Sequence, residues 1–127
     1  MVEVKTVDTD KAAAAVGPYS QAKIVGDLVY TSGQIPINPA SGKIESEDVQ
    51  DQTHAVVANL NAILEEAGSG LDQVVKATCF LTDMGDFQAF NEVYAEYFTS
   101  KPARSCYQVC DLPAGAKCEI EVIAVVK

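Results

Sequence analysis

Two strand-like runs close the sequence: Pro102-Ala103-Arg104-Ser105-Cys106-Tyr107-Gln108-Val109 and Lys117-Cys118-Glu119-Ile120-Glu121-Val122. Arg104 is the only arginine in the chain, and Glu119 stands in an otherwise apolar segment. A planar guanidinium group suits a carboxylate ligand, and a carboxylate in a partly apolar place suits the handling of a proton or a water molecule. The alternative is that both are surface charges, Arg104 in a salt bridge and Glu119 as exposed as Glu121.

The size of the chain fits one domain, residues 1–127, and 48% of its residues are hydrophobic, enough for a real core. No apolar run is long enough to span a membrane. The N-terminal residues 1–5 lack the basic start and apolar block of a secretory signal. We therefore expect a cytoplasmic protein that does not associate with a membrane.

The charge and the cysteines exclude two kinds of site. The net charge is −9 and the lysines are scattered singly, so no nucleic-acid partner is expected. The chain has a single histidine, His54, and no C-x-x-C pair, so no metal site is expected. We expect reduced, half-buried thiols at all four cysteines, which are Cys79, Cys106, Cys110 and Cys118.

The remaining elements follow outward from the two runs. Gly26-Asp27 between apolar runs predicts a two-residue hairpin of residues 20–25 and 28–32. A helical apolar stripe predicts a helix capped by Ser46 and ended by Gly68 and Gly70. A second helix, capped by Asp83 or Asp86, runs to residue 98. Strands are predicted over residues 3–6, 74–81, 105–110 and 116–126, with a loop over 38–43 and the last two strands paired in a final hairpin around the turn 112–115.

This order indicates an α+β fold whose sheet is wider than two helices can cover on both faces. The last strand carries Ile123 and Val125 on its second face, which therefore needs cover. We infer an oligomer in which the sheets of neighbouring subunits pack together.

The motifs, in their order and spacing, resemble those of the RidA/YjgF family of reactive-intermediate deaminases, from residue 17 to the C-terminus. The combination of Pro-x-Arg-Ser with the later Glu-Ile-Glu is specific to that family, whereas Thr-Ser-Gly alone would be weak. The matching segments are Gly17-Pro18-Tyr19, Thr31-Ser32-Gly33-Gln34-Ile35-Pro36, Asp86-Phe87 with Asn91 and Tyr94, Pro102-Ala103-Arg104-Ser105, and Glu119-Ile120-Glu121 with Ala124.

The resemblance implies a chorismate-mutase-like α+β subunit with a mostly antiparallel sheet of about six strands and two helices on one face. It implies a homotrimer with the sheets inward and clefts between subunits. It also implies hydrolysis of enamine and imine acids, such as 2-aminoacrylate and 2-iminobutanoate, to 2-oxo acids and ammonia, without cofactor or metal.

The family's site residues fall on matching positions here. The carboxylate-binding arginine falls on Arg104 and the water-positioning glutamate on Glu119. The other cleft residues fall on Tyr19, Ser32, Gly33, Asn91 and Cys106.

Each of these cleft residues has a plain structural alternative. Asn91 could be a buried amide that pairs with the backbone, Tyr19 a packing residue, Ser32 the end of a strand and Gly33 a turn residue. Cys106 lacks a histidine partner, so we favour a pocket wall over a nucleophile. Two functional alternatives also stay open: a trimer that only binds 2-oxo acids or acts as a chaperone, and, less favoured because of the acidity, an endoribonuclease.

Overall fold

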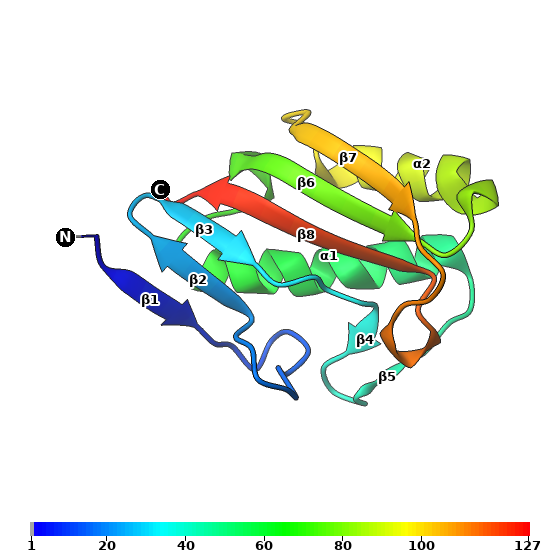
Figure 1. Ribbon diagram of the computed structural model, residues 1–127, viewed down its shortest axis with the longest axis horizontal. Coiled ribbons are helices and arrows are strands. Elements are labelled where there is room, and N and C mark those ends of the chain that lie inside the picture. Colours follow the sequence, from blue (N-terminus) through cyan, green and yellow to red (C-terminus); the bar gives the residue numbers. More distant parts are fainter. Residues whose placement is uncertain (1) are drawn as a thin grey trace.

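The strands form a six-stranded sheet in the order β1-β2-β3-β8-β6-β7, and both helices lie on one of its faces (Figure 1). The computed structural model describes residues 2–127. The α+β class predicted from the sequence, with about six mostly antiparallel strands and two helices, is confirmed. The strands are β1 Val4–Val7, β2 Ala22–Val25, β3 Leu28–Thr31, β6 Val74–Leu81, β7 Ala103–Gln108 and β8 Cys118–Val125, and the helices are α1 Val49–Glu66 and α2 Phe87–Tyr97.

The predicted final hairpin is wrong, because β7 and β8 do not pair with each other. β7 pairs in parallel with β6, and β8 lies between β3 and β6, antiparallel to both. The chain crosses from β6 to β7 through α2, and a crossover helix joins parallel strands. β8 takes the centre, where its alternate residues are buried, while the more polar β7 takes an edge of the sheet.

Two local predictions also need correction. Asp48, not Ser46, caps α1: its side chain accepts a hydrogen bond from the backbone N–H of Asp51, and Ser46 supports that turn from outside. The segment predicted as a loop over 38–43 includes parts of a small hairpin, in which β4 (Ile37–Asn38) pairs with β5 (Lys43–Ile44). The end of α1 is as predicted, since Gly68 follows it at a φ of +81°.

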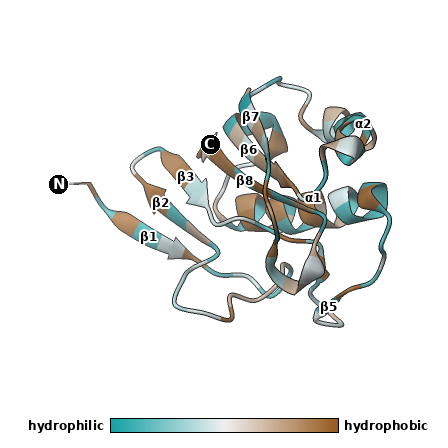
Figure 2. Ribbon diagram, turned by 45° about the vertical axis from the view of Figure 1, so that its right-hand side comes forward, coloured by the Kyte–Doolittle hydropathy of each residue, from teal (hydrophilic) through white to brown (hydrophobic). Residues whose placement is uncertain are grey.

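The core lies between the helices and one face of the sheet. Along β8 the buried residues alternate with partly exposed ones, and the buried set faces the helices. Leu60 and Ile63 of α1 and Phe90 of α2 are fully buried against it, each burial contributing roughly 1.5–3 kcal/mol. Figure 2 shows the two helices together on the same side of the strands.

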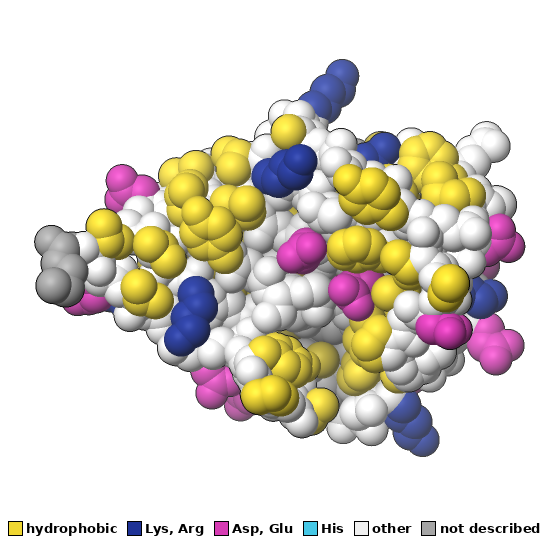
Figure 3. Space-filling model, viewed as in Figure 1, with side chains coloured by type: hydrophobic (Ala, Val, Ile, Leu, Met, Phe, Trp, Pro, Cys, Tyr) yellow, Lys and Arg dark blue, Asp and Glu magenta, His cyan; other side chains and the backbone are white. Residues whose placement is uncertain are grey.

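The opposite face of the sheet exposes apolar side chains. Cross-strand partners share a face, so the register places Val4, Val25 and Leu28 in one row with Val125, and Tyr30 opposite Ile123. Val4 is 59% exposed and Tyr30 is 42% exposed. Figure 3 shows this face, with apolar groups gathered over β1 to β3 and acidic groups near the centre. The face thus has the character expected of a subunit interface, while the oligomer stays a prediction.

Within residues 2–127, no helix combines the length and the apolar character that crossing a membrane requires.

Candidate active site

The sequence-predicted site residues fall into two groups on opposite faces of the sheet. Arg104 and Cys106 of β7 pair in register with the buried Ala77 and Cys79 of β6, so their side chains lie on the helix face. Glu119 of β8 pairs with Phe80, one residue out of phase with the buried set, so its side chain lies on the open face.

Arg104 is held from three sides by α2. Its Nη1 donates a hydrogen bond to Oδ1 of Asn91. Its guanidinium carbon lies 4.7 Å from the ring centroid of Tyr94 and 5.5 Å from that of Phe87, both within the range of a cation–π interaction. The Asn91 side chain therefore holds one edge of the guanidinium group, instead of pairing with buried backbone groups.

The arginine keeps its charge free for a ligand. Among residues 2–127, no carboxylate forms an ion pair with Arg104. It lines a cavity of about 490 Å³ together with Asn91, Tyr94, Phe98 and Pro102. An arginine has five N–H donors in a planar fork, so the edge not used by Asn91 has the geometry to hold a carboxylate with two hydrogen bonds.

Glu119 lies in a second, larger cavity on the open face. This cavity is about 620 Å³, and Tyr19, Ser32 and Gly33 line it with Glu119. A Cβ atom at Gly33 would overlap the Glu119 carboxylate and would lie 2.8 Å from its Cδ atom. Any side chain at position 33 would therefore displace the carboxylate end of Glu119.

The polar neighbours of Glu119 are largely occupied. The Ser32 hydroxyl donates to the carbonyl oxygen of Ser20 at 2.6 Å. The amide of Gln21 is buried and bonds the backbone of Thr9 and Ala13. Glu119 and the half-exposed Tyr19 are thus the side chains best placed to meet a ligand in this cavity.

The environment of Glu119 favours its protonated form. Burial raises the pKa of this carboxyl group, and the like charge of Glu121 raises it further. A carboxylate whose pKa moves toward neutrality is a better proton acceptor when it is ionised and a better donor when it is not. The position therefore suits general acid–base work on a water molecule.

The cysteines do not provide a nucleophile. All four are free; Cys79 and Cys118 are buried, Cys106 is partly buried and Cys110 is exposed, so they are not uniformly half-buried as expected. Burial raises the pKa of the Cys106 thiol, although Arg104 opposes the shift. His54, the only histidine, bonds the hydroxyl of Tyr97 on the exposed side of the helices. Cys106 follows Arg104 on the same face of β7 but does not line the Arg104 cavity, so its role as a pocket wall stays a prediction.

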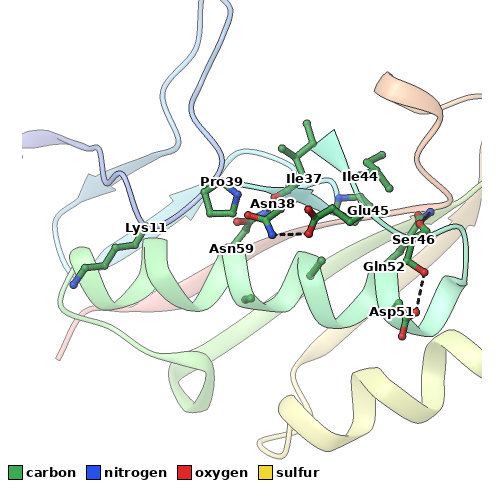
Figure 4. Close-up of a pocket in the computed structure, with 13 residues that line it drawn as sticks. Lys11, Ile37, Asn38, Pro39, Ile44, Glu45, Ser46, Asp51, Gln52 and Asn59 are labelled. Atoms are coloured by element: carbon green, nitrogen blue, oxygen red, sulfur yellow. Dashed lines mark hydrogen bonds between the residues drawn. The ribbon is translucent and has the colours of Figure 1, made fainter. Parts of the chain in front are cut away.

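A third cavity, of about 330 Å³, lies between α1 and the β4–β5 hairpin (Figure 4). None of the seven predicted site residues lines it. Its polar side chains pair with one another: Asn38 donates to Glu45, and Ser46 donates to Asp51. The first contact joins the two sides of the hairpin and the second ties its end to the start of α1, so we assign the cavity a structural role.

Sequence reasoning missed four residues around the two groups. Sequence analysis named Phe87 and Tyr94 only as parts of a matching motif and gave them no role, yet their rings face Arg104. The only sequence signal was their position one helical turn before and after Asn91. Pro113 and Ala114 line the Glu119 cavity from a turn in which Ala114 has a φ of +59°, and no local pattern brings that turn to residues 32–33.

One chain does not bring the two groups together. Glu119 pairs with Phe80, and Phe80 pairs with Tyr107, so Arg104 lies two strands away and three residues further along β7. These offsets amount to roughly 10 Å across the sheet and 10 Å along it, and the side chains leave opposite faces. Each chain thus presents two half-sites, one with a cation and one with a carboxylate.

Within residues 2–127, no three His, Cys, Asp or Glu side chains are grouped as a metal ion would require. That the reaction needs no metal or cofactor stays a prediction.

Comparison with known proteins shows what this chain is similar to. The family model described as Endoribonuclease L-PSP matches residues 9–126. The chain is 49% identical to Reactive Intermediate Deaminase A, chloroplastic, of Arabidopsis thaliana, over 97% of this chain and 66% of that protein. It is 47% identical to the 2-iminobutanoate/2-iminopropanoate deaminase of Capra hircus, over 95% of this chain and 89% of that protein.

A solved structure agrees with these relatives. The crystal structure of E. coli TdcF with bound serine superposes with a TM-score of 0.92 at 44% identity, covering 97% of this chain and 99% of that one. The matching family model, the curated relatives and the shared fold show that the chain belongs to the RidA/YjgF family, whose family model carries the description Endoribonuclease L-PSP.

Proposed function

We propose that the protein hydrolyses reactive enamine and imine acids, such as 2-aminoacrylate and 2-iminobutanoate, to 2-oxo acids and ammonia. The observation that carries this is the state of Arg104: α2 holds it with an amide and two rings, yet no carboxylate in residues 2–127 neutralises it. A guanidinium group that is held in position and carries an unpaired charge can bind a small carboxylate. The deaminase names of relatives at 47–49% identity support the same reaction.

The chemistry needs one anchor and one acid–base group. Arg104 holds the substrate carboxylate and fixes the orientation of the C=N carbon. Glu119 accepts a proton from a water molecule while the water oxygen bonds to that carbon. Starting from the protonated imine, this addition gives a neutral carbinolamine, and the same carboxyl group returns the proton to its nitrogen. The C–N bond then breaks, ammonia leaves with the bonding electron pair, and Glu119 takes the hydroxyl proton as the C=O bond of the 2-oxo acid forms. Enamine substrates first tautomerise to imines.

Because the half-sites lie on opposite faces of one chain, we propose that the complete site joins two protomers of a homotrimer. Arg104 comes from one protomer and Glu119 from its neighbour. The exposed apolar residues of the open face, including Val25, Tyr30 and Tyr107, support an interface there. Proteins rarely leave a broad apolar sheet face in water.

Mixed trimers test this arrangement. Arg104→Ala and Glu119→Gln should each lack activity when assayed alone with a threonine dehydratase and threonine, scored by the rate of 2-oxobutanoate release. When the two variants are unfolded together and refolded as a mixture, about a quarter of the sites should combine an intact Arg104 with an intact Glu119. Recovery of about a quarter of wild-type activity is expected.

Two results would contradict the proposal. Wild-type protein that does not accelerate 2-oxobutanoate release would exclude the deaminase. Single variants that are inactive and stay inactive after mixing, although mixed trimers are detected by mass spectrometry, would exclude the shared site.

The family description names an endoribonuclease, but the charge of this chain argues against RNA as substrate. A net charge of −9 opposes the approach of a phosphate backbone. If RNA were the substrate, cleavage should persist through repurification and disappear in Arg104→Ala.

A further inference from the structure

We propose that Tyr94 is a positioning residue for Arg104, acting through the face of its ring and not through its hydroxyl group. This inference rests on the proposed role of Arg104 in holding the substrate carboxylate. It assigns a function to a side chain that sequence analysis named only as part of a matching motif.

The first observation is the geometry of the ring. The Arg104 guanidinium carbon lies closer to the Tyr94 centroid, at 4.7 Å, than to the Phe87 centroid, at 5.5 Å. Tyr94 is itself stacked on Phe98, with centroids 4.3 Å apart and ring planes 19° from parallel. Phe98 therefore holds the Tyr94 ring in place, and a ring in a fixed position defines where the guanidinium group of Arg104 lies.

The second observation is the hydroxyl group of Tyr94. It is buried and, in residues 2–127, has no hydrogen-bond partner. An unpaired buried hydroxyl costs stability, and it forms no hydrogen bond that could hold Arg104. Burial raises the pKa of Tyr94 to about 12, so the phenol is neutral and offers Arg104 no ionic partner. What Tyr94 offers the arginine is the face of its ring.

The third observation is which part of the Arg104 guanidinium group each neighbour contacts. Asn91 accepts a hydrogen bond from Nη1 at one edge, and the guanidinium carbon lies over the rings of Tyr94 and Phe87. These contacts leave the second edge free. A guanidinium group held in this way loses little freedom when a carboxylate binds, which favours affinity without changing the chemical step.

The inference predicts a split between binding and turnover. Tyr94→Phe keeps the ring, so binding of 2-oxobutanoate should stay within about two-fold of wild type and the melting temperature should be unchanged or higher. Tyr94→Leu keeps a buried apolar side chain without the ring. It should raise KM and the Kd of 2-oxobutanoate by about 3- to 30-fold, the range of a cation–π contact, with kcat nearly unchanged.

Fluorination separates the electronic effect from packing. Phenylalanine with one, two and three ring fluorines at position 94 weakens the negative ring face step by step at almost constant shape. The Kd of 2-oxobutanoate should rise with each fluorine. The matched control is the same series at Phe90, which is fully buried in α2 and stacks near Tyr94 but has no contact with Arg104; there the Kd should stay flat.

A direct readout does not depend on activity. Because Arg104 is the only arginine, its side-chain Nε–Hε group gives a single NMR signal. In wild type that signal should be shifted by the ring current and rigid, and in Tyr94→Leu it should move to the position of a free arginine and become mobile.

Four results would overturn the inference. They are an unshifted or mobile signal in wild type, equal losses of binding in Tyr94→Phe and Tyr94→Leu, a flat fluorine series at position 94, and a fall in kcat without a rise in KM. If the wild type neither hydrolyses imines nor binds 2-oxobutanoate, the proposed function fails, and the NMR signal still decides whether Tyr94 positions Arg104.

Discussion

Replacing Gly33 by alanine should remove most of the activity while leaving the substrate carboxylate bound. The added Cβ would lie 2.8 Å from Cδ of Glu119 and 3.1 Å from its Cγ, against 3.4 Å for ordinary contact. The carboxylate must therefore withdraw by at least 0.6 Å, and further at its oxygen. A misplacement of about 1 Å in a reacting group can cost about 10²-fold in rate, or about 2.7 kcal/mol of transition-state stabilisation.

The assay follows 2-oxobutanoate release in the coupled dehydratase reaction and measures kcat and KM separately. We expect kcat to fall by about 10²-fold and the Kd of 2-oxobutanoate to change little, because the added Cβ meets Glu119, whereas the proposed carboxylate anchor is Arg104. The free energy of unfolding should fall by at most about 1 kcal/mol, because the atoms that must move are the end of a flexible side chain that lines a cavity.

Two further variants isolate the cause. Gly70→Ala is the matched control: neither glycine has a positive φ, and the new Cβ at Gly70 would also meet flexible side-chain ends, those of Asp72 and Lys127, which do not line the Glu119 cavity. Shortening the acid should relieve the overlap, so Glu119→Asp should cost less stability in the Gly33→Ala background than in wild type. Wild-type kcat in Gly33→Ala, or strictly additive losses of stability in the double variant, would refute the assigned contact.

Four other perturbations have defined outcomes. Burial and Glu121 raise the pKa of Glu119, so ionisation of this group lowers the stability of the folded state as the pH rises through that pKa. Thermal melts should therefore find Glu119→Gln more stable than wild type at pH 8 and equally stable near pH 3. A difference that stays constant with pH would contradict this. Glu121→Gln removes the like charge, so the acidic limb of kcat/KM should move to lower pH, and an unmoved limb would count against the coupling. Arg104→Lys keeps the charge but loses the planar fork, and titration calorimetry should find 2-oxobutanoate binding weaker by roughly 10- to 100-fold; near-normal binding would refute a two-bond contact. Tyr30→Asp on the open face should convert trimers to monomers in light scattering and remove activity, whereas His54→Asp on the exposed side of α1 should do neither.

Local patterns predicted most of the elements. Gly26-Asp27 identified the β2–β3 hairpin, and the apolar stripes identified α1 and α2. These signals are local, because turn chemistry and helical periodicity depend on neighbours within a few residues. The pairing of β8 with β3 and β6 depends on contacts far apart in the sequence, and adjacency along the chain favoured the wrong partner, β7.

The candidate site was predictable as a set of residues but not as an arrangement. Matching motifs identified Arg104, Glu119 and the residues around them. As long as the strand register is unknown, however, spacing along the chain does not tell on which face of the sheet each side chain lies. The reason for Gly33 was also hidden, because its neighbour Glu119 lies far along the chain. The role of Tyr94 was masked because a core aromatic and a ring over an arginine share the same helical spacing.

The place of β8 has a consequence for synthesis of the protein. The last regular element to be made, Cys118–Val125, is a central strand with neighbours on both sides. While the ribosome still holds that segment, β3 and β6 have no strand between them, and the nascent chain exposes the apolar faces that will form the core. The sheet is therefore completed only when this segment is free to pair, and a truncation that removes residues 118–125 would take out the middle of the sheet rather than an edge.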